Sequence, residues 1–204
     1  MSNKSPSSQG KNEARRSTAP QSANPSIGAY VIAGLLLAVS AYIIYRMVGQ
    51  AIARNQAEQP LSGVQSFPPP AAGHQEGALT YEQIPPVGGA HNSAWQNCGA
   101  YTEPIRNENG VHTLEHGAVW ITYAPELPAD EVQQLQTLTR QSTYRLLSPY
   151  AGLPSPIVIS AWGYQLQLET ASDPRLGQFI EAYELNPAGP EPGAPCTNGI
   201  GEPQ

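Results

Sequence analysis

A long apolar stretch near the N-terminus is the strongest feature in the hydropathy pattern of this chain. Residues 27–48, IGAYVIAGLLLAVSAYIIYRMV, contain no charged side chain before Arg46. A helix of this length, at about 1.5 Å per residue, crosses a hydrocarbon core about 30 Å thick. Tyr42 and Tyr45 precede Arg46, and such aromatic and basic side chains suit the lipid head groups. The pattern therefore predicts one transmembrane helix over residues 27–48.

Basic residues are distributed unevenly around this stretch. Four lie before it, and two lie at its end or beyond it: Lys4, Lys11, Arg15, Arg16, then Arg46 and Arg54. By the positive-inside rule, we predict a single-pass protein of the cytoplasmic membrane, with the N-terminus in the cytoplasm and the C-terminal domain outside. A cleaved signal peptide is the alternative, because Ala-Ile-Ala at residues 51–53 resembles a cleavage site. The apolar stretch is longer than the core of an ordinary signal peptide, which favours a retained anchor.

Three other segments lack a regular pattern of apolar positions. Residues 1–26 are rich in Ser, Asn and Gln, which predicts a disordered cytoplasmic tail. Residues 49–78 are rich in Pro and Gly, and we predict an extended linker in which His74 is solvated. Residues 186–204 contain five prolines and are predicted to form a tail without a helix or strand of its own. Residues 79–185 remain as the predicted folded domain.

The apolar period within residues 79–185 changes repeatedly between that of strands and that of helices. Runs of β-branched and aromatic residues, or alternation of apolar residues with Gln, predict strands. These strands cover residues 118–123, 144–147, 157–161 and 164–168, and the last two form a hairpin. Helical spacing follows Pro128 and Pro174, each at the start of an amphipathic helix. We therefore predict an α+β domain, with a small antiparallel or mixed sheet and two helices on one face.

The net charge of −6 is divided unequally along the chain. Residues 1–57 carry six basic side chains against Glu13, a net charge of +5, so the other residues carry −11. Nucleic acids and anionic lipids are recognised by basic surfaces. The acidic domain is therefore predicted to bind no nucleic acid, and cations or proteins are better partners for it.

A short central stretch, residues 91–123, holds most of the side chains capable of chemistry. His112, Glu115 and His116 have the order His-x-x-Glu-His, which inverzincin metalloproteases use. His91 lies earlier in the same stretch. Imidazole suits copper and zinc, and an acidic surface attracts cations. We therefore identify His91, His112, His116 and Glu115 as candidate ligands of a copper or zinc ion.

Two other interpretations of these histidines remain open. A zinc-dependent hydrolase requires the motif on a helix. Asn109-Gly110 is a turn signal and Gly117 leads into a strand, so at most a turn or two of helix is predicted, which disfavours that enzyme. The second interpretation is structural, with His112 and His116 hydrogen-bonded so that they hold an irregular segment against the sheet.

The chain has two cysteines, Cys98 and Cys196. Outside the cytoplasm, a disulfide between them is favoured over free thiols or a metal–thiolate site. Such a bond ties the proline-rich C-terminal tail back to the central stretch.

Several blocks of sequence carry a resemblance to a known family. These blocks are GGAHNSAWQNCGAYTEPIRNENGVHTLEHGAVWITY, LLSPYAGLPSPIVISAWGYQLQL, DPRLGQFI and GAPC. Over about residues 79–198 the chain resembles a bacterial family of single-span membrane proteins that share domain of unknown function 3105. The resemblance implies a shared site and no particular activity. It matches motif positions at His91, Cys98, His112, Glu115, His116 and Cys196, with Gly89-Ala90 where the family has Gly-Pro.

We predict from these observations a membrane-anchored extracytoplasmic domain that binds copper or zinc through a histidine cluster. A non-catalytic role is favoured over an enzyme. The alternative function is an accessory or interaction subunit of a membrane protein complex, with residues 27–48 packed in the lipid bilayer. The zinc-dependent hydrolase is a remote alternative that rests on the His-x-x-Glu-His motif.

Overall fold

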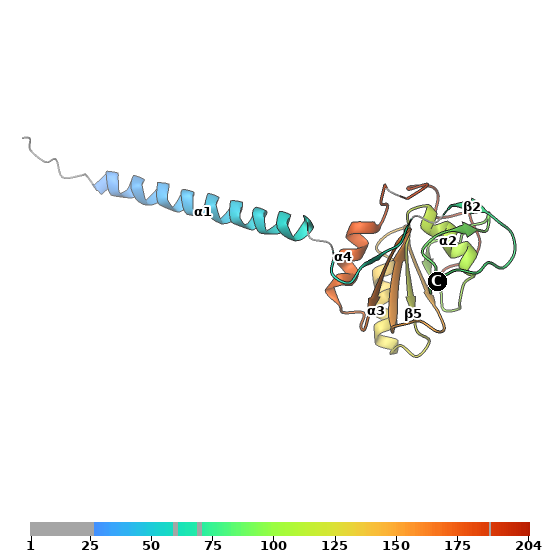
Figure 1. Ribbon diagram of the computed structural model, residues 1–204. Coiled ribbons are helices and arrows are strands. Elements are labelled where there is room, and N and C mark those ends of the chain that lie inside the picture. Colours follow the sequence, from blue (N-terminus) through green and yellow to red (C-terminus); the bar gives the residue numbers. More distant parts are fainter. Residues whose placement is uncertain (1–26, 59–60, 69–70, 188) are drawn as a thin grey trace, which may run out of the picture. The chain divides into compact units, whose positions relative to one another are not determined.

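The chain divides into two compact units with the boundary between Glu58 and Gln59. The computed structural model describes residues 27–58, 61–68, 71–187 and 189–204 (Figure 1). The predicted disordered tail, residues 1–26, lies outside the described residues.

Helix α1, Ile27–Glu58, is the first unit's described part. Its segment Tyr30–Gln50 is long and apolar enough to cross a membrane, and a signal sequence has the same properties. The helix continues ten residues past the predicted end at Val48 because residues 49–58 contain good helix formers and the next proline is Pro60. The linker therefore begins later than predicted.

A six-stranded mixed sheet forms the centre of the second unit. The strand order is β1-β8-β7-β5-β6-β4. Parallel pairs join β6 to β5 and to β4, and the other neighbours are antiparallel. The bounds are β1 Gln65–Ser66, β4 Gly99–Ala100, β5 Val119–Tyr123, β6 Arg145–Pro149, β7 Ile157–Ala161 and β8 Tyr164–Leu168. The α+β prediction and the β7–β8 hairpin are confirmed.

Two helices, α3 at Ala129–Thr139 and α4 at Pro174–Tyr183, cover one face of this sheet. In α4 the Asp173 side chain accepts a hydrogen bond from the backbone N–H of Arg175, which caps the helix N-terminus. Both helices bury apolar side chains against the sheet, as their helical spacing predicted. This core contains Val119, Ile121, Leu135, Leu147, Ile157, Ile159, Leu166, Leu168, Leu176, Phe179 and Ile180.

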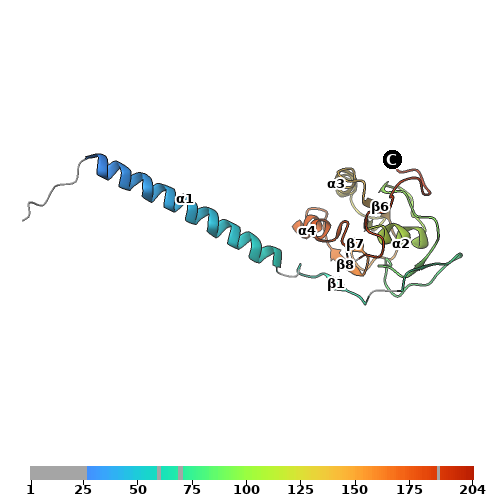
Figure 2. The same cartoon turned by 90° about the horizontal axis from the view of Figure 1, so that it is seen from above.

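Helix α2, Asn107–Glu115, covers the opposite face of the sheet (Figure 2). Successive side chains of a strand point to opposite faces, so Trp120 of β5 leaves the first core and packs with Val111 and Leu114 of α2. Strand β5 therefore belongs to two cores, and it fixes α2 relative to the sheet.

The segments on either side of the predicted domain are part of the folded unit. Strand β1 pairs with β8, and β2, Gly73–His74, pairs in parallel with β3, Ala90–His91. The boundary predicted at residue 79 therefore lies too late, because backbone pairing includes parts of the Pro/Gly-rich segment in the fold. The described part of residues 186–204 has no helix or strand apart from an isolated bridge between Ile200 and Gln96.

Candidate metal centre

Four side chains from three elements converge beside α2. His74 lies on β2, His91 on β3, and His112 and Glu115 on α2. One ligand atom from each of these residues can be chosen so that all four atoms lie within 4.8 Å of one another. The spacing of three residues puts His112 and Glu115 on the same side of the helix. We call these four residues the His/Glu cluster.

The position of α2 depends on Gly110, which the Asn-Gly pattern predicted to lie in a turn before any helix. A Cβ atom at Gly110 would lie 2.7 Å from Cζ3 of Trp120, so the absence of a side chain lets the indole ring pack against the helix backbone. Asn109 lies inside the helix as well, and its amide donates to the carbonyl oxygen of Ala94 at 2.6 Å. The prediction of at most a turn or two of helix was wrong, because tertiary packing outweighs the local turn preference of Asn-Gly.

Backbone carbonyls fix the tautomers of two cluster histidines. Nδ1 of His91 lies 2.8 Å from the carbonyl oxygen of Gly89, and Nδ1 of His112 lies 2.7 Å from that of Asn92. A carbonyl oxygen accepts hydrogen bonds, so each Nδ1 carries the proton. In a neutral ring Nε2 then has a free lone pair, which is the form that a metal-binding histidine takes.

The contact between His91 and Glu115 is unusual because the two side chains approach closely without forming a hydrogen bond. Nε2 of His91 lies 2.9 Å from Oε2 of Glu115, yet its geometry is not that of a hydrogen bond and the described residues give this buried nitrogen no hydrogen-bond partner. The His91 side chain is 0% exposed and that of Glu115 is 7% exposed. With Nδ1 protonated and the ring neutral, two acceptors face each other away from water, an arrangement that requires a proton or a cation.

Burial sets the charge of His112. Loss of hydration lowers the pKa of His112 from its ordinary value of 6.5 to about 4, while the hydrogen bond to Asn92 opposes this shift. The neighbouring rings of His116, His91 and His74 lower the pKa further, because like charges repel. His112 is therefore neutral at pH 7, and its Nε2 is available as a ligand.

His74 is exposed, as predicted, but it is not isolated in solvent. Its ring centroid lies 5.2 Å from that of His91 and 5.0 Å from that of His112. The pairing of β2 with β3 sets His74 directly beside His91. Sequence reasoning missed this residue because two-residue strands give no periodic signal, and nearby prolines indicated a linker.

The structure separates His116 from the other predicted ligands. Its ring centroid is 4.6 Å from that of His112, but His116 does not belong to the His/Glu cluster. Nδ1 of His116 lies 2.7 Å from the carbonyl oxygen of Pro195, and Nε2 lies 4.0 Å from a carboxylate oxygen of Glu191. His116 is the C-cap of α2 and keeps helical backbone angles, φ −71° and ψ 0°, so its ring still lies beside that of His112, while its Nδ1 faces the C-terminal segment. Of the His-x-x-Glu-His motif, His112 and Glu115 therefore belong to the His/Glu cluster and His116 does not.

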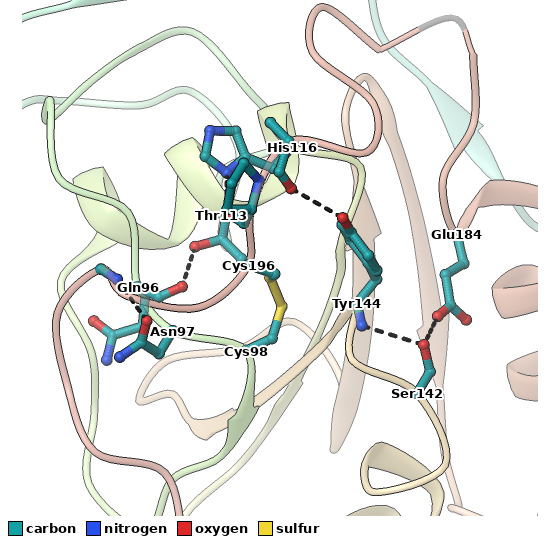
Figure 3. The surroundings of a disulfide bond; sticks show 12 residues. Gln96, Asn97, Cys98, Thr113, His116, Ser142, Tyr144, Glu184 and Cys196 are labelled. Atoms are coloured by element: carbon teal, nitrogen blue, oxygen red, sulfur yellow. Dashed lines mark hydrogen bonds between the residues drawn. A yellow bond between two sulfur atoms is a disulfide. The ribbon is translucent and has the colours of Figure 1, made fainter.

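A disulfide between Cys98 and Cys196 lies near His116 (Figure 3). The backbone N–H of Cys98 donates to the carbonyl oxygen of Cys196 at 2.8 Å. Thr113 of α2 donates through its hydroxyl to the carbonyl oxygen of Gln96 at 2.8 Å. The disulfide and these hydrogen bonds fasten the C-terminal segment and the β4 region to the side of α2 that bears His116.

A family model described as a protein of unknown function (DUF3105) matches residues 74–198. The matched region begins at His74, and it contains the whole His/Glu cluster and both cysteines. No curated protein and no solved structure matches the chain.

Proposed function

The chain belongs to this family of proteins of unknown function, DUF3105, and we propose that its folded unit binds one copper or zinc ion at the His/Glu cluster. The observation that carries this proposal is the 2.9 Å approach of His91 Nε2 to Glu115 Oε2 without hydrogen-bond geometry. Two ligand atoms bound to one zinc ion at about 2.0–2.1 Å lie roughly 3 Å apart. The two atoms therefore have the separation of neighbouring ligands.

The donor set selects the class of metal. Three imidazoles and one carboxylate suit zinc and copper(II), whereas calcium and magnesium prefer oxygen ligands alone. The methionines of the chain are Met1 and Met47, so the folded unit supplies no thioether for copper(I). The carbonyl oxygens of Gly89 and Asn92 hold the rings of His91 and His112 in the ligand tautomer, which is a common feature of metal sites.

We further propose that α1 is retained as a membrane anchor and that the folded unit lies outside the cytoplasm. The excess of basic residues before the apolar segment supports this orientation. The disulfide supports it independently, because such bonds persist in oxidising compartments. An ion encountered outside the cytoplasm would then reach the cluster without crossing the membrane.

Metal analysis of the full chain tests the binding proposal. The protein is purified in detergent without a metal-binding tag and incubated with zinc or copper(II), and bound metal is measured after removal of the excess. We expect about one ion per chain, and a His91→Ala/His112→Ala variant that retains little metal. No bound ion in the unaltered protein after either incubation would overturn the proposal. It would favour the alternative, in which a proton lies between His91 and Glu115 and the cluster is structural.

Loss of metal from the double variant would be uninformative if that variant misfolds, so a Glu115→Gln variant provides a second test. Gln has nearly the shape of Glu and can donate a hydrogen bond to His91 Nε2, so the fold is preserved. We expect circular dichroism like that of the unaltered protein and a much weaker affinity for metal. An unchanged affinity would remove Glu115 from the ligand set.

A further inference from the structure

One member of the His/Glu cluster is held differently from the other three. His91, His112 and Glu115 are at most 5% exposed as residues, whereas His74 is exposed. His74 belongs to residues 73–77, Gly-His-Gln-Glu-Gly, all of which are exposed. We call this segment the strap. It has no aliphatic side chain, so burial of apolar surface contributes little to holding it in place.

Hydrogen bonds attach the strap to the folded unit. The backbone N–H of Gln75 donates to the carbonyl oxygen of His91 at 2.7 Å. The Glu76 carboxylate accepts from the amide of Asn92 at 2.7 Å and from the hydroxyl of Ser93 at 2.9 Å. Figure 1 shows β2, which begins the strap, beside α2. A surface segment held by a few hydrogen bonds and no buried apolar side chain opens at a smaller free-energy cost than a core element.

Asn92 links the strap to the buried part of the cluster. Its side-chain amide donates to Glu76, and its carbonyl oxygen accepts from Nδ1 of His112. The Asn92 side chain is further oriented because its Oδ1 accepts from the backbone N–H of Ala94 at 2.9 Å. The same residue therefore positions a buried ligand through its backbone and the exposed strap through its side chain.

We propose that the strap is the route by which the bound ion is exchanged, with His74 as the replaceable ligand and Glu76 as the positioning residue that keeps the strap closed. This inference rests on the proposed metal binding. When the strap opens, the ion loses the His74 imidazole and keeps its three buried ligands. The vacated coordination position is then open to a ligand from an external acceptor, and transfer proceeds by exchange of ligands without a change in oxidation state.

The test compares rates of metal release from the full chain. Zinc-loaded protein is mixed with excess of a coloured zinc chelator, and the absorbance of the chelator complex gives the release rate. A Glu76→Ala variant loses both side-chain contacts, so we expect release about tenfold faster, the factor that corresponds to about 1.4 kcal/mol. Ser93→Ala removes one contact and should give a smaller increase. Glu82→Ala, which removes an exposed carboxylate of the same charge outside the strap, should leave the rate unchanged.

Two further measurements test whether Glu76 positions the strap. They separate this role from direct binding of the metal by Glu76 and from a general loosening of the fold. The visible spectrum of the cobalt(II)-substituted protein should change in His74→Ala and be preserved in Glu76→Ala. Hydrogen exchange of the Gln75 amide in metal-free protein should be faster in Glu76→Ala, while amides of β5 keep their protection. A cobalt spectrum altered by Glu76→Ala would make Glu76 a ligand and overturn its assigned role.

Equal release rates in the unaltered protein, Glu76→Ala and His74→Ala, with one ion bound in each, would overturn the exchange route and leave the metal site intact. Failure of the unaltered protein to bind zinc or cobalt would instead overturn the proposed function, and the exchange route with it.

Discussion

The imidazole rings of His112 and His116 lie 4.6 Å apart between centroids, but their Nδ1 atoms bind carbonyl oxygens of different segments. His112 donates to Asn92, next to β3, and His116 donates to Pro195, next to the disulfide. Both residues are buried and both belong to the end of α2. Only His112 belongs to the His/Glu cluster, so we predict different tasks for the two histidines of one motif.

Matched alanine variants of these two residues should separate the tasks. We expect His112→Ala to weaken metal binding by a factor of at least about 100, since a ligand is lost, and His116→Ala to bind one ion per chain with less than about tenfold loss. Isothermal titration calorimetry of each full-chain variant with zinc gives both stoichiometry and affinity. Equal loss of binding in the two variants would contradict this assignment and restore His116 as a ligand.

The disulfide should contribute to stability independently of the metal. It closes a loop between residues 98 positions apart in the sequence, and removal of such a cross-link typically costs about 2–4 kcal/mol. A Cys98→Ser/Cys196→Ser variant should unfold at lower urea concentration, followed by tryptophan fluorescence. The amides of Gly193 and Ile200, which donate to His116 and Trp95, should exchange faster in this variant. Unchanged exchange at both amides would show that hydrogen bonds alone hold the C-terminal segment.

The same substitution in two helices should have opposite effects on stability. Gly110→Ala in α2 places a Cβ atom 2.7 Å from the Trp120 ring, and we expect a loss of about 1–3 kcal/mol from overpacking. Gly177→Ala in α4 meets nothing within 4 Å, so the higher helix propensity of Ala should add about 0.5–1 kcal/mol. Urea unfolding of both variants measures the difference. A change in the free energy of unfolding of the same sign in both variants would contradict the packing of Trp120 on α2.

Stability of the metal-free protein should fall in mild acid. The pKa of His112 is lowered to about 4 by burial, from an ordinary value of 6.5, so between these values the unfolded chain binds a proton that the folded chain does not. The free energy of unfolding should therefore decrease as the pH falls from about 6.5 to about 4. A His112→Gln variant cannot titrate at this position and should show a shallower slope in that range. Parallel slopes in urea titrations of the two proteins would contradict the lowered pKa.

The fold was largely predictable because its main elements carry strong periodic patterns. Trp120 and Ile121 belong to an apolar run that predicted β5, and Leu176, Phe179 and Ile180 have the spacing of one helical face. The end of α1 and helix α2 were harder to predict. Residues 49–58 extend a helix with weak apolar signal, and α2 contains Asn109-Gly110, whose local preference is outweighed by contact with Trp120.

The site was predictable only in part. His91, His112 and Glu115 lie in a short stretch dense in polar side chains, and the His-x-x-Glu-His order marks two of them, so the sequence indicated them. His74 is brought to them by the pairing of two-residue strands, which leaves no trace in the hydropathy pattern. His116 was included through its spacing from His112, which does bring the two rings together, but its ring nitrogens face Pro195 and Glu191 of the C-terminal segment.

The position of the two cysteines has a consequence for the fate of the protein after proteolysis. The covalent ring closed by Cys98 and Cys196 contains α2, α3, α4 and the strands β4 to β8. A single cut in any loop between the cysteines opens the ring but leaves both pieces joined through sulfur. Such a nick therefore cannot shed the C-terminal piece until the bond is reduced, and a nicked molecule migrates as two fragments only on a reducing gel.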